Sequence, residues 1–180
     1  MRAEADALRA VCLARLGRSA EAEASAARAE AWFATIPPAL AEPMRLHLRG
    51  ELALARGDGA GALRALAQAA ALGPTKTIAV DPGPVELNYA LARAALATGD
   101  DAQARRALGQ VVEAGPARVL APLSFVRSLA LLAALEEKAG RDAMARRLYE
   151  RYLGYWKAGQ IDRAEVTRAS ARVAALKPSA

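Results

Sequence analysis

Few residues of this 180-residue chain could do chemistry, and they do not gather into a recognisable set. The chain has one histidine, His47, and one cysteine, Cys12, so it can form neither a His/Cys metal cluster nor an internal disulfide. An acidic pair stands at 136–137 and another at 100–101, but neighbours on a helix do not face each other. We therefore expect no catalytic residue, no metal and no cofactor, and we expect Cys12 to be a small buried side chain.

The glycine-rich run GDGAG at 57–61 is the segment most similar to a phosphate-binding loop. Such a loop needs a lysine after the glycines and a strand before them, and this run has neither. We expect a turn between two helices here.

The charge balance is basic, with 25 Lys and Arg against 19 Asp and Glu and a net charge of +6. These basic residues are interleaved with acids and are not accompanied by aromatic side chains on which bases could stack, so we expect no nucleic-acid partner. No apolar run approaches the ~20 residues needed to cross a bilayer, and the first residues lack the apolar stretch of a secretory signal. We expect a cytoplasmic protein with no membrane partner.

One layout repeats four times along the chain and indicates the elements that position these side chains. A turn glycine stands at 17, 57, 99 and 140, at spacings of 40, 42 and 41 residues, and an alanine follows five residues after each glycine. Apolar helical stretches lie on both sides of each turn, and Ser or Asp stands near the start of the second stretch, where its oxygen can cap a helix. A period of about 41 residues is typical of a helical solenoid built from two-helix units.

The segment 50–74 resembles a tetratricopeptide repeat (TPR), in which two antiparallel helices form each unit. The matching residues are Gly50, Gly57, Asp58, Ala62, Leu66, Ala69 and Pro74, and the segment 91–116 matches in the same way. The resemblance implies an all-α fold, an α-solenoid of about four TPR-like repeats in one array over residues 1–180. We expect repeats at 3–36, 38–74, 84–116 and 122–157, a loop at 74–84, and a C-terminal capping helix at 162–176.

The C-terminal part differs from the other units. Tyr149, Tyr152, Tyr155 and Trp156 follow helical spacing and predict a heavier end layer. Asp162 followed three residues later by Glu165 predicts a capping box. The stretch from residue 125 onward is also similar to the TPR tails of bacterial Ser/Thr kinases and cyclases.

In the TPR family the first helices line a concave groove that binds peptides. The resemblance places eight residues there: His47, Leu48, Glu51, Leu54, Tyr89, Arg93, Arg127 and Leu131. The leucines and Tyr89 would receive apolar anchors, and Arg93 and Arg127 would clamp a carboxylate through their planar guanidinium groups. A purely structural pair of Arg93 with Glu51 or Glu86 is the alternative.

The sequence therefore predicts a non-catalytic scaffold that binds a peptide or protein segment in its concave groove. Two alternatives stay open. The chain is a regulatory or sensor module of a larger bacterial signalling protein or transcription regulator, or it forms a homo-oligomer through its alanine-rich faces or its aromatic C-terminal layer.

Overall fold

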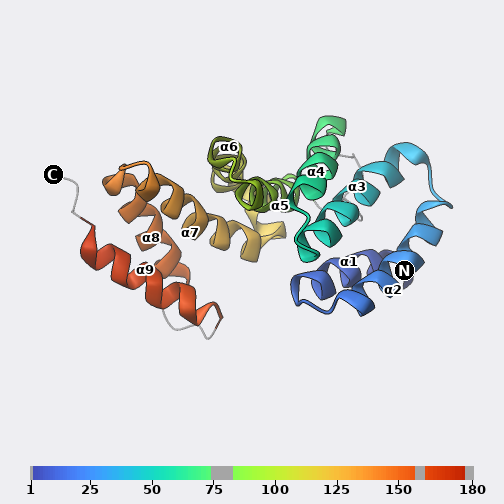
Figure 1. The fold of residues 1–180 in the computed structure, drawn as a ribbon, viewed down its shortest axis with the longest axis horizontal. Helices are drawn as coiled ribbons and strands as arrows, with labels where there is room; N and C mark the ends of the chain where they lie inside the picture. Colours follow the sequence, from blue (N-terminus) through green and yellow to red (C-terminus); the bar gives the residue numbers. More distant parts are fainter. Residues whose placement is uncertain (1, 74–82, 157–160, 177–180) are drawn as a thin grey trace.

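The computed structural model describes residues 2–73, 83–156 and 161–176, and these residues form helices without any strand (Figure 1). The elements are α1 (Arg2–Arg15), α2 (Ser19–Phe33), α3 (Pro38–Ala55), α4 (Gly59–Leu72), α5 (Gly83–Thr98), α6 (Asp101–Val112), the 3-10 helix η1 (Gly115–Leu120), α7 (Pro122–Lys138), α8 (Asp142–Trp156) and α9 (Arg163–Ala175). None of these described helices is long and apolar enough to cross a membrane. The predicted all-α fold is confirmed.

Consecutive helices pair into hairpins, α1 with α2, α3 with α4, α5 with α6 and α7 with α8. The turn glycines at 17, 57, 99 and 140 have φ values of 73°, 77°, 77° and 71°, the left-handed region that a side chain disfavours. The N–H of Gly57 donates to the carbonyl of Leu54 at 3.1 Å. The next N–H, of Asp58, reaches back to Ala53 at 2.9 Å, which completes a Schellman motif. The same pair of bonds closes the other three turns, so the four bends are equivalent.

Small residues allow the two helices of each hairpin to approach closely. The small residues at these crossings are all buried: Ala10, Gly50, Ala92 and Ala133 on the first helices and Ala22, Ala62, Ala104 and Ala145 on the second helices. The contact is tightest at Gly50, where an added Cβ would lie 2.4 Å from Cγ of Leu66. Gly50 therefore sets the distance between α3 and α4.

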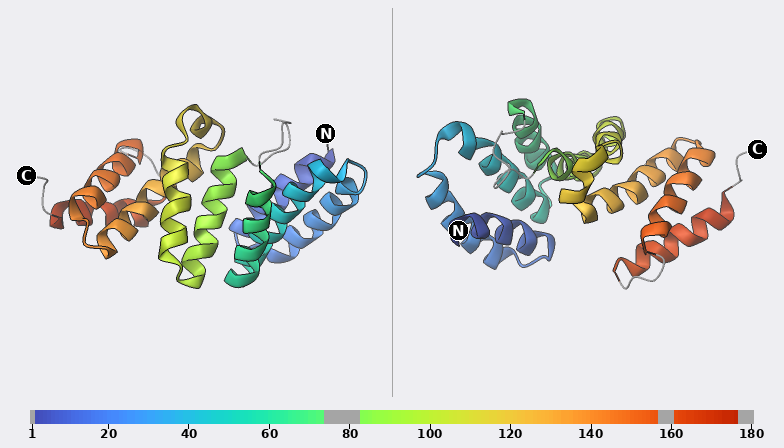
Figure 2. Two further views of the ribbon diagram at one scale, coloured as in Figure 1. Left: turned by 90° about the horizontal axis from the view of Figure 1, so that it is seen from above. Right: turned by 180° about the vertical axis from the view of Figure 1, so that it is seen from behind.

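The hairpins stack into an arch with α1 and α2 at one end and α9 at the other (Figures 1 and 2). Each first helix packs on the next first helix, α1 on α3, α3 on α5 and α5 on α7. Within the described part of the chain, the second helices have no comparable packing on one another and contact instead the first helix that follows. The first helices therefore lie closer together and form the inner, concave wall, as a solenoid of this kind requires.

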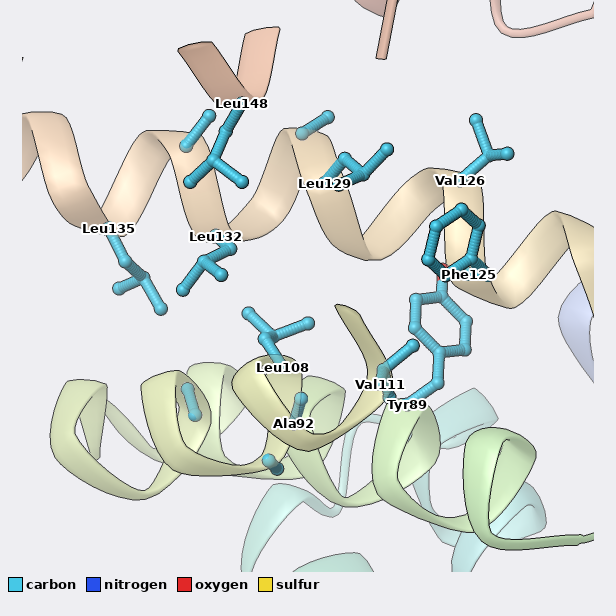
Figure 3. Packing of buried hydrophobic residues seen from close by; sticks show 14 of the residues in the cluster. Tyr89, Ala92, Leu108, Val111, Phe125, Val126, Leu129, Leu132, Leu135 and Leu148 are labelled. Carbon is cyan, nitrogen blue, oxygen red and sulfur yellow. The ribbon is translucent and has the colours of Figure 1, made fainter. Parts of the chain in front are cut away.

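The apolar core runs through the stacked hairpins rather than around one centre. Its largest cluster extends from α4 to α9 and includes Leu66 and Tyr152. Figure 3 shows part of this cluster, with Leu108, Leu129 and Leu148. A second cluster around Phe33 joins α1, α2 and α3. Burial raises the pKa of both Tyr149 and Tyr152 to about 12, in the aromatic layer of α8.

Helix caps agree with the sequence prediction at two turns and differ elsewhere. Asp58 accepts from the N–H of Gly61 at 2.7 Å, and Asp100 accepts from the N–H of Gln103 at 2.8 Å. The predicted capping box at Asp162 is wrong: this residue is left-handed, with φ 55°, and its side chain makes no cap. Its carboxylate is used elsewhere, by an arginine of α7.

Other expectations also need correction. Cys12 is exposed, so the expectation of a small buried side chain is wrong. The expected loop at 74–84 falls outside the described residues up to position 82, and α5 already begins at Gly83.

Candidate functional site

The residues predicted for the groove lie on α3, α5 and α7, three of the helices that form the concave wall. His47, Leu48, Glu51 and Tyr89 are buried, whereas Leu54, Arg93, Arg127 and Leu131 are partly exposed. The first four are thus covered by neighbouring helices, and the last four reach solvent.

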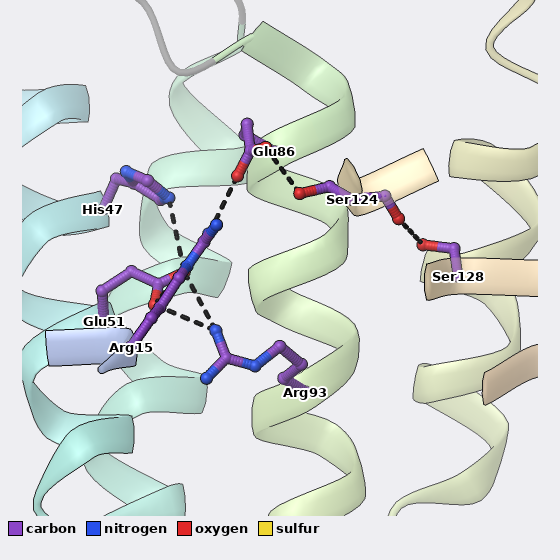
Figure 4. Close-up of polar contacts among 7 residues, drawn as sticks. All are labelled: Arg15, His47, Glu51, Glu86, Arg93, Ser124 and Ser128. Atoms are coloured by element: carbon purple, nitrogen blue, oxygen red, sulfur yellow. Dashed lines mark hydrogen bonds and ion pairs between the residues drawn. The ribbon is translucent and has the colours of Figure 1, made fainter. Parts of the chain in front are cut away.

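A buried carboxylate, that of Glu51, lies at the centre of this wall (Figure 4). Arg15 of α1 donates to it from Nη2 at 2.7 Å and from Nε at 3.2 Å, and Arg93 of α5 donates from Nη1 at 3.0 Å. Burial alone raises the pKa of Glu51, but the hydrogen bonds and charges of Arg15 and the charge of Arg93 outweigh it, so the pKa lies below its usual value. His47 Nε2 lies 3.9 Å from Oε1 of the same carboxylate.

The polar contacts continue from α1 to α5 and α7. Nη2 of Arg15 also donates to Glu86 at 2.8 Å, and the hydroxyl of Ser124 donates to the other oxygen of Glu86 at 2.5 Å. Ser128 then donates to the carbonyl of Ser124 at 2.7 Å. We call Arg15, His47, Glu51, Glu86, Arg93, Ser124 and Ser128 the concave network (Figure 4). It connects all four first helices.

Tyr89 lies between two arginines of this network. The guanidinium carbons of Arg15 and Arg93 are each 5.8 Å from the centre of its ring, a distance at which cations are attracted to an aromatic face. Burial raises the pKa of Tyr89, and the charges of Arg93, Arg127 and Arg15 oppose this shift without cancelling it. The Tyr89 hydroxyl therefore stays protonated at neutral pH, and the guanidinium groups of Arg15 and Arg93 lie near its ring.

Arg127 is held by a carboxylate from outside the network. Its Nε and Nη2 donate to the two oxygens of Asp162 at 2.8 and 2.9 Å, a two-pronged pair that raises the pKa of Arg127. This contact joins α7 to the residue before α9 and explains why Asp162 does not cap that helix.

The exposure of the charges decides what this surface can do. The side chains of Arg15, Arg93 and Arg127 are 25%, 28% and 37% exposed, whereas that of Glu51 is 0% exposed. The guanidinium groups are therefore in contact with solvent, whereas the Glu51 carboxylate is not. Among the described residues no group of three or more His, Cys, Asp or Glu could hold a metal ion. This arrangement is suited to binding acceptor groups.

The sequence prediction of this site did not include Arg15, Ser124 or Asp162. The positions of residues within each repeat nevertheless indicated one of its charged pairs. Glu51 and Arg93 each stand six residues before a turn glycine, in consecutive units. Equivalent positions on neighbouring first helices lie close together, so opposite charges there indicate a pair.

Comparison with known proteins supports the repeat assignment over part of the chain. The sequence model of the tetratricopeptide repeat family matches residues 53–121, from the end of α3 to the residue after η1. No curated protein matches the chain significantly. The match supports a relationship to the tetratricopeptide repeat family in this central segment, and the described helices on both sides of it continue the same hairpin architecture.

Proposed function

We propose that this protein is a non-catalytic scaffold that binds a peptide or protein segment on the concave face formed by α1, α3, α5 and α7. Tetratricopeptide repeats generally mediate contacts between proteins, which supports this type of function. The observation that carries the proposal is that three partly exposed guanidinium groups, of Arg15, Arg93 and Arg127, belong to three helices of the concave wall.

The chemistry of the face favours a ligand with acidic and apolar side chains. Arg93 is bound to a fully buried carboxylate, which a ligand cannot displace without a large desolvation cost. Arg127 is more exposed, and its partner Asp162 lies nearer the solvent. Arg127 is therefore the cation whose bond a ligand carboxylate can exchange, while partly exposed Leu131, one turn further along α7, offers apolar contact.

Two other roles would use this architecture differently. As a regulatory module of a larger bacterial signalling protein, the chain would receive its ligand from another part of the same polypeptide. A homo-oligomer would need a surface outside the concave face. The four-helix inner wall favours capture of a separate segment.

The test begins with peptides selected from a random phage-displayed library on the purified chain. We expect the selected peptides to contain acidic residues beside apolar ones and to bind the variant Arg127→Ala/Leu131→Asp at least about tenfold more weakly. The charge-matched control is Arg106→Ala/Leu72→Asp, because Arg106 on α6 and Leu72 on α4 are exposed and lie on second helices. Thermal melting of each variant separates lost binding from lost structure. Equal affinity of the wild type and the double variant would contradict a concave site.

A further inference from the structure

The hydroxyl of Tyr152 is a buried donor that the fold does not use. Tyr152 lies on α8 and is fully buried, and its hydroxyl donates no hydrogen bond within the described part of the chain. Tyr149, three residues earlier on the same helix, is also buried, but its hydroxyl donates to Glu137 at 3.3 Å. Burying a donor without an acceptor is unfavourable, and such groups are rare in native proteins. The Tyr152 hydroxyl therefore indicates a role beyond packing.

This hydroxyl lies beside the ion pair of Arg127 and Asp162. Burial raises the pKa of Tyr152, the charges of Asp162 and Glu165 raise it further, and the charge of Arg127 opposes them. Charges shift a pKa in this way only when they are close to the titrating group. The unused donor and the arginine proposed to bind a ligand carboxylate are thus neighbours.

Helix α9 packs on this part of α8 (Figure 1). Ala169 of α9 is fully buried, and Val166 and Val173 pack against the same apolar cluster that contains Tyr152. Within the described residues, α9 has no packing on α7 comparable to that of each first helix on the next. The connection between α9 and α7 is therefore made by long charged side chains.

The polar contacts hold the two ends of α9 unequally. At its C-terminal end, Arg172 pairs with Glu137 of α7, and Arg146 of α8 donates to two backbone carbonyl groups at 3.1 and 2.8 Å. At its N-terminal end, the polar contact with α7 in the described part of the chain is the pair of Asp162 with Arg127. Loss of that pair releases the first turn of α9 while the last turn stays attached.

We propose that Tyr152 is a second hydrogen-bond donor of the concave site, covered by the first turn of α9 until a ligand carboxylate displaces Asp162 from Arg127. The start of α9 then moves away from α7, and the Tyr152 hydroxyl donates to a second acceptor of the ligand. The favoured ligand carries two acidic side chains close together, one for each donor. This inference rests on the proposed function, because it adds a residue and a ligand group to the same site.

Isothermal titration calorimetry with the selected acidic peptides tests the role of the hydroxyl. We expect Tyr152→Phe to bind them about tenfold more weakly, because a hydrogen bond to a charged acceptor is lost. Its melting temperature should not fall, since the hydroxyl has no acceptor in the free protein. The matched control is Tyr149→Phe, which should lower the melting temperature and leave the affinity unchanged. A loss of stability without a loss of affinity in Tyr152→Phe would overturn the proposal.

Hydrogen exchange detected by mass spectrometry tests the movement of α9 without a ligand. Asp162→Asn should speed exchange at residues 166–169 and leave residues 173–176 unchanged, whereas Arg146→Ala should do the reverse. Equal exchange of α9 in the wild type and Asp162→Asn would overturn the release of its first turn.

The outcomes separate this inference from the proposed function. Peptides that lose affinity in Arg127→Ala/Leu131→Asp but not in Tyr152→Phe would overturn the inference alone. Failure to select any peptide that binds the concave face would overturn both.

Discussion

Oε1 of Glu51 lies 2.7 Å from Nη2 of Arg15, although 36 positions separate the two residues in sequence and the Glu51 side chain is fully buried. The bond joins α3 to α1, and Arg93 extends it to α5. Three first helices are thereby fixed to one another along the inside of the arch. Because the second helices do not share such bonds in the described part of the chain, the separation of the inner helices sets how sharply the arch bends.

Replacing Glu51 by glutamine should destabilise the protein strongly. The amide leaves the partly buried guanidinium group of Arg93 without its countercharge and Arg15 with Glu86 alone, and breaking a buried pair in this way costs about 3 kcal/mol of unfolding free energy. Urea denaturation measures the loss. The control is Glu21→Gln, which removes an exposed pair with Arg18 and should change stability by less than about 1 kcal/mol. Similar losses for both variants would show that the buried pairs do not fix the inner helices.

The same carboxylate makes stability depend on pH. Since the pKa of Glu51 is below 4.5 in the folded protein, the unfolded chain takes up the proton first as the pH falls. The stabilisation is therefore complete above pH 4.5 and is lost as the pH falls through the lowered pKa. Glu136 acts in the same direction, because its hydrogen bond from Arg141 lowers its pKa.

We expect the stability difference between wild type and Glu51→Gln to be largest near neutral pH and to shrink below pH 4.5. Denaturation curves of both proteins across the acid range check this. A difference that stayed constant down to the acid transition would mean that Glu51 is not ionised in the folded protein.

Two glycine substitutions should change stability in opposite directions. Gly50→Ala introduces a methyl group 2.4 Å from Cγ of the fully buried Leu66, and the resulting overpacking between α3 and α4 should cost about 1–3 kcal/mol. Gly109 lies inside α6, where an added Cβ meets no atom within 4 Å. Gly109→Ala should therefore stabilise the protein by about 0.5–1 kcal/mol through helix propensity. Thermal unfolding shows whether each variant is less or more stable than the wild type. An unchanged stability of Gly50→Ala would refute close packing of α3 and α4 at Gly50.

The repeated turns could be predicted from sequence because their causes are local. A glycine that must be left-handed and an aspartate that caps the next helix act within a few residues, so the pattern at Gly57 and Asp58 was sufficient. The partner of Arg93 could not be decided between Glu51 and Glu86, since the answer depends on how far α1 reaches along the inner wall. Arg15 takes Glu86 and shares Glu51 with Arg93.

Two sequence predictions were wrong for the same reason: each depends on contacts between residues that are far apart in sequence. Asp162 has the right spacing for a helix cap, but the charge of Arg127, 35 positions earlier, takes its carboxylate. Cys12 is a small side chain of a type that is often buried, but no described helix covers it. Patterns within one unit predict the hairpins, whereas contacts between units and the ends of the array depend on the stacked structure.

The bond between Arg127 and Asp162 gives a prediction for ligand binding. Asp162→Asn keeps a residue that tolerates the left-handed backbone at φ 55° but removes the carboxylate that occupies Arg127. If an acidic ligand exchanges with Asp162, as the proposed function requires, the variant should bind the selected acidic peptides several-fold more tightly. Isothermal titration calorimetry measures the change.

The matched control is Glu150→Gln on α8, which also removes a carboxylate paired with an arginine but lies on a second helix. It should leave the affinity unchanged, because it alters the net charge by the same amount at a distance from the concave face. Adding Arg127→Ala to Asp162→Asn should abolish the gain, since the released guanidinium is the group that the ligand contacts. Unchanged affinity in Asp162→Asn would mean that the pair joining α7 to α9 is structural, and that the ligand uses other residues of the wall.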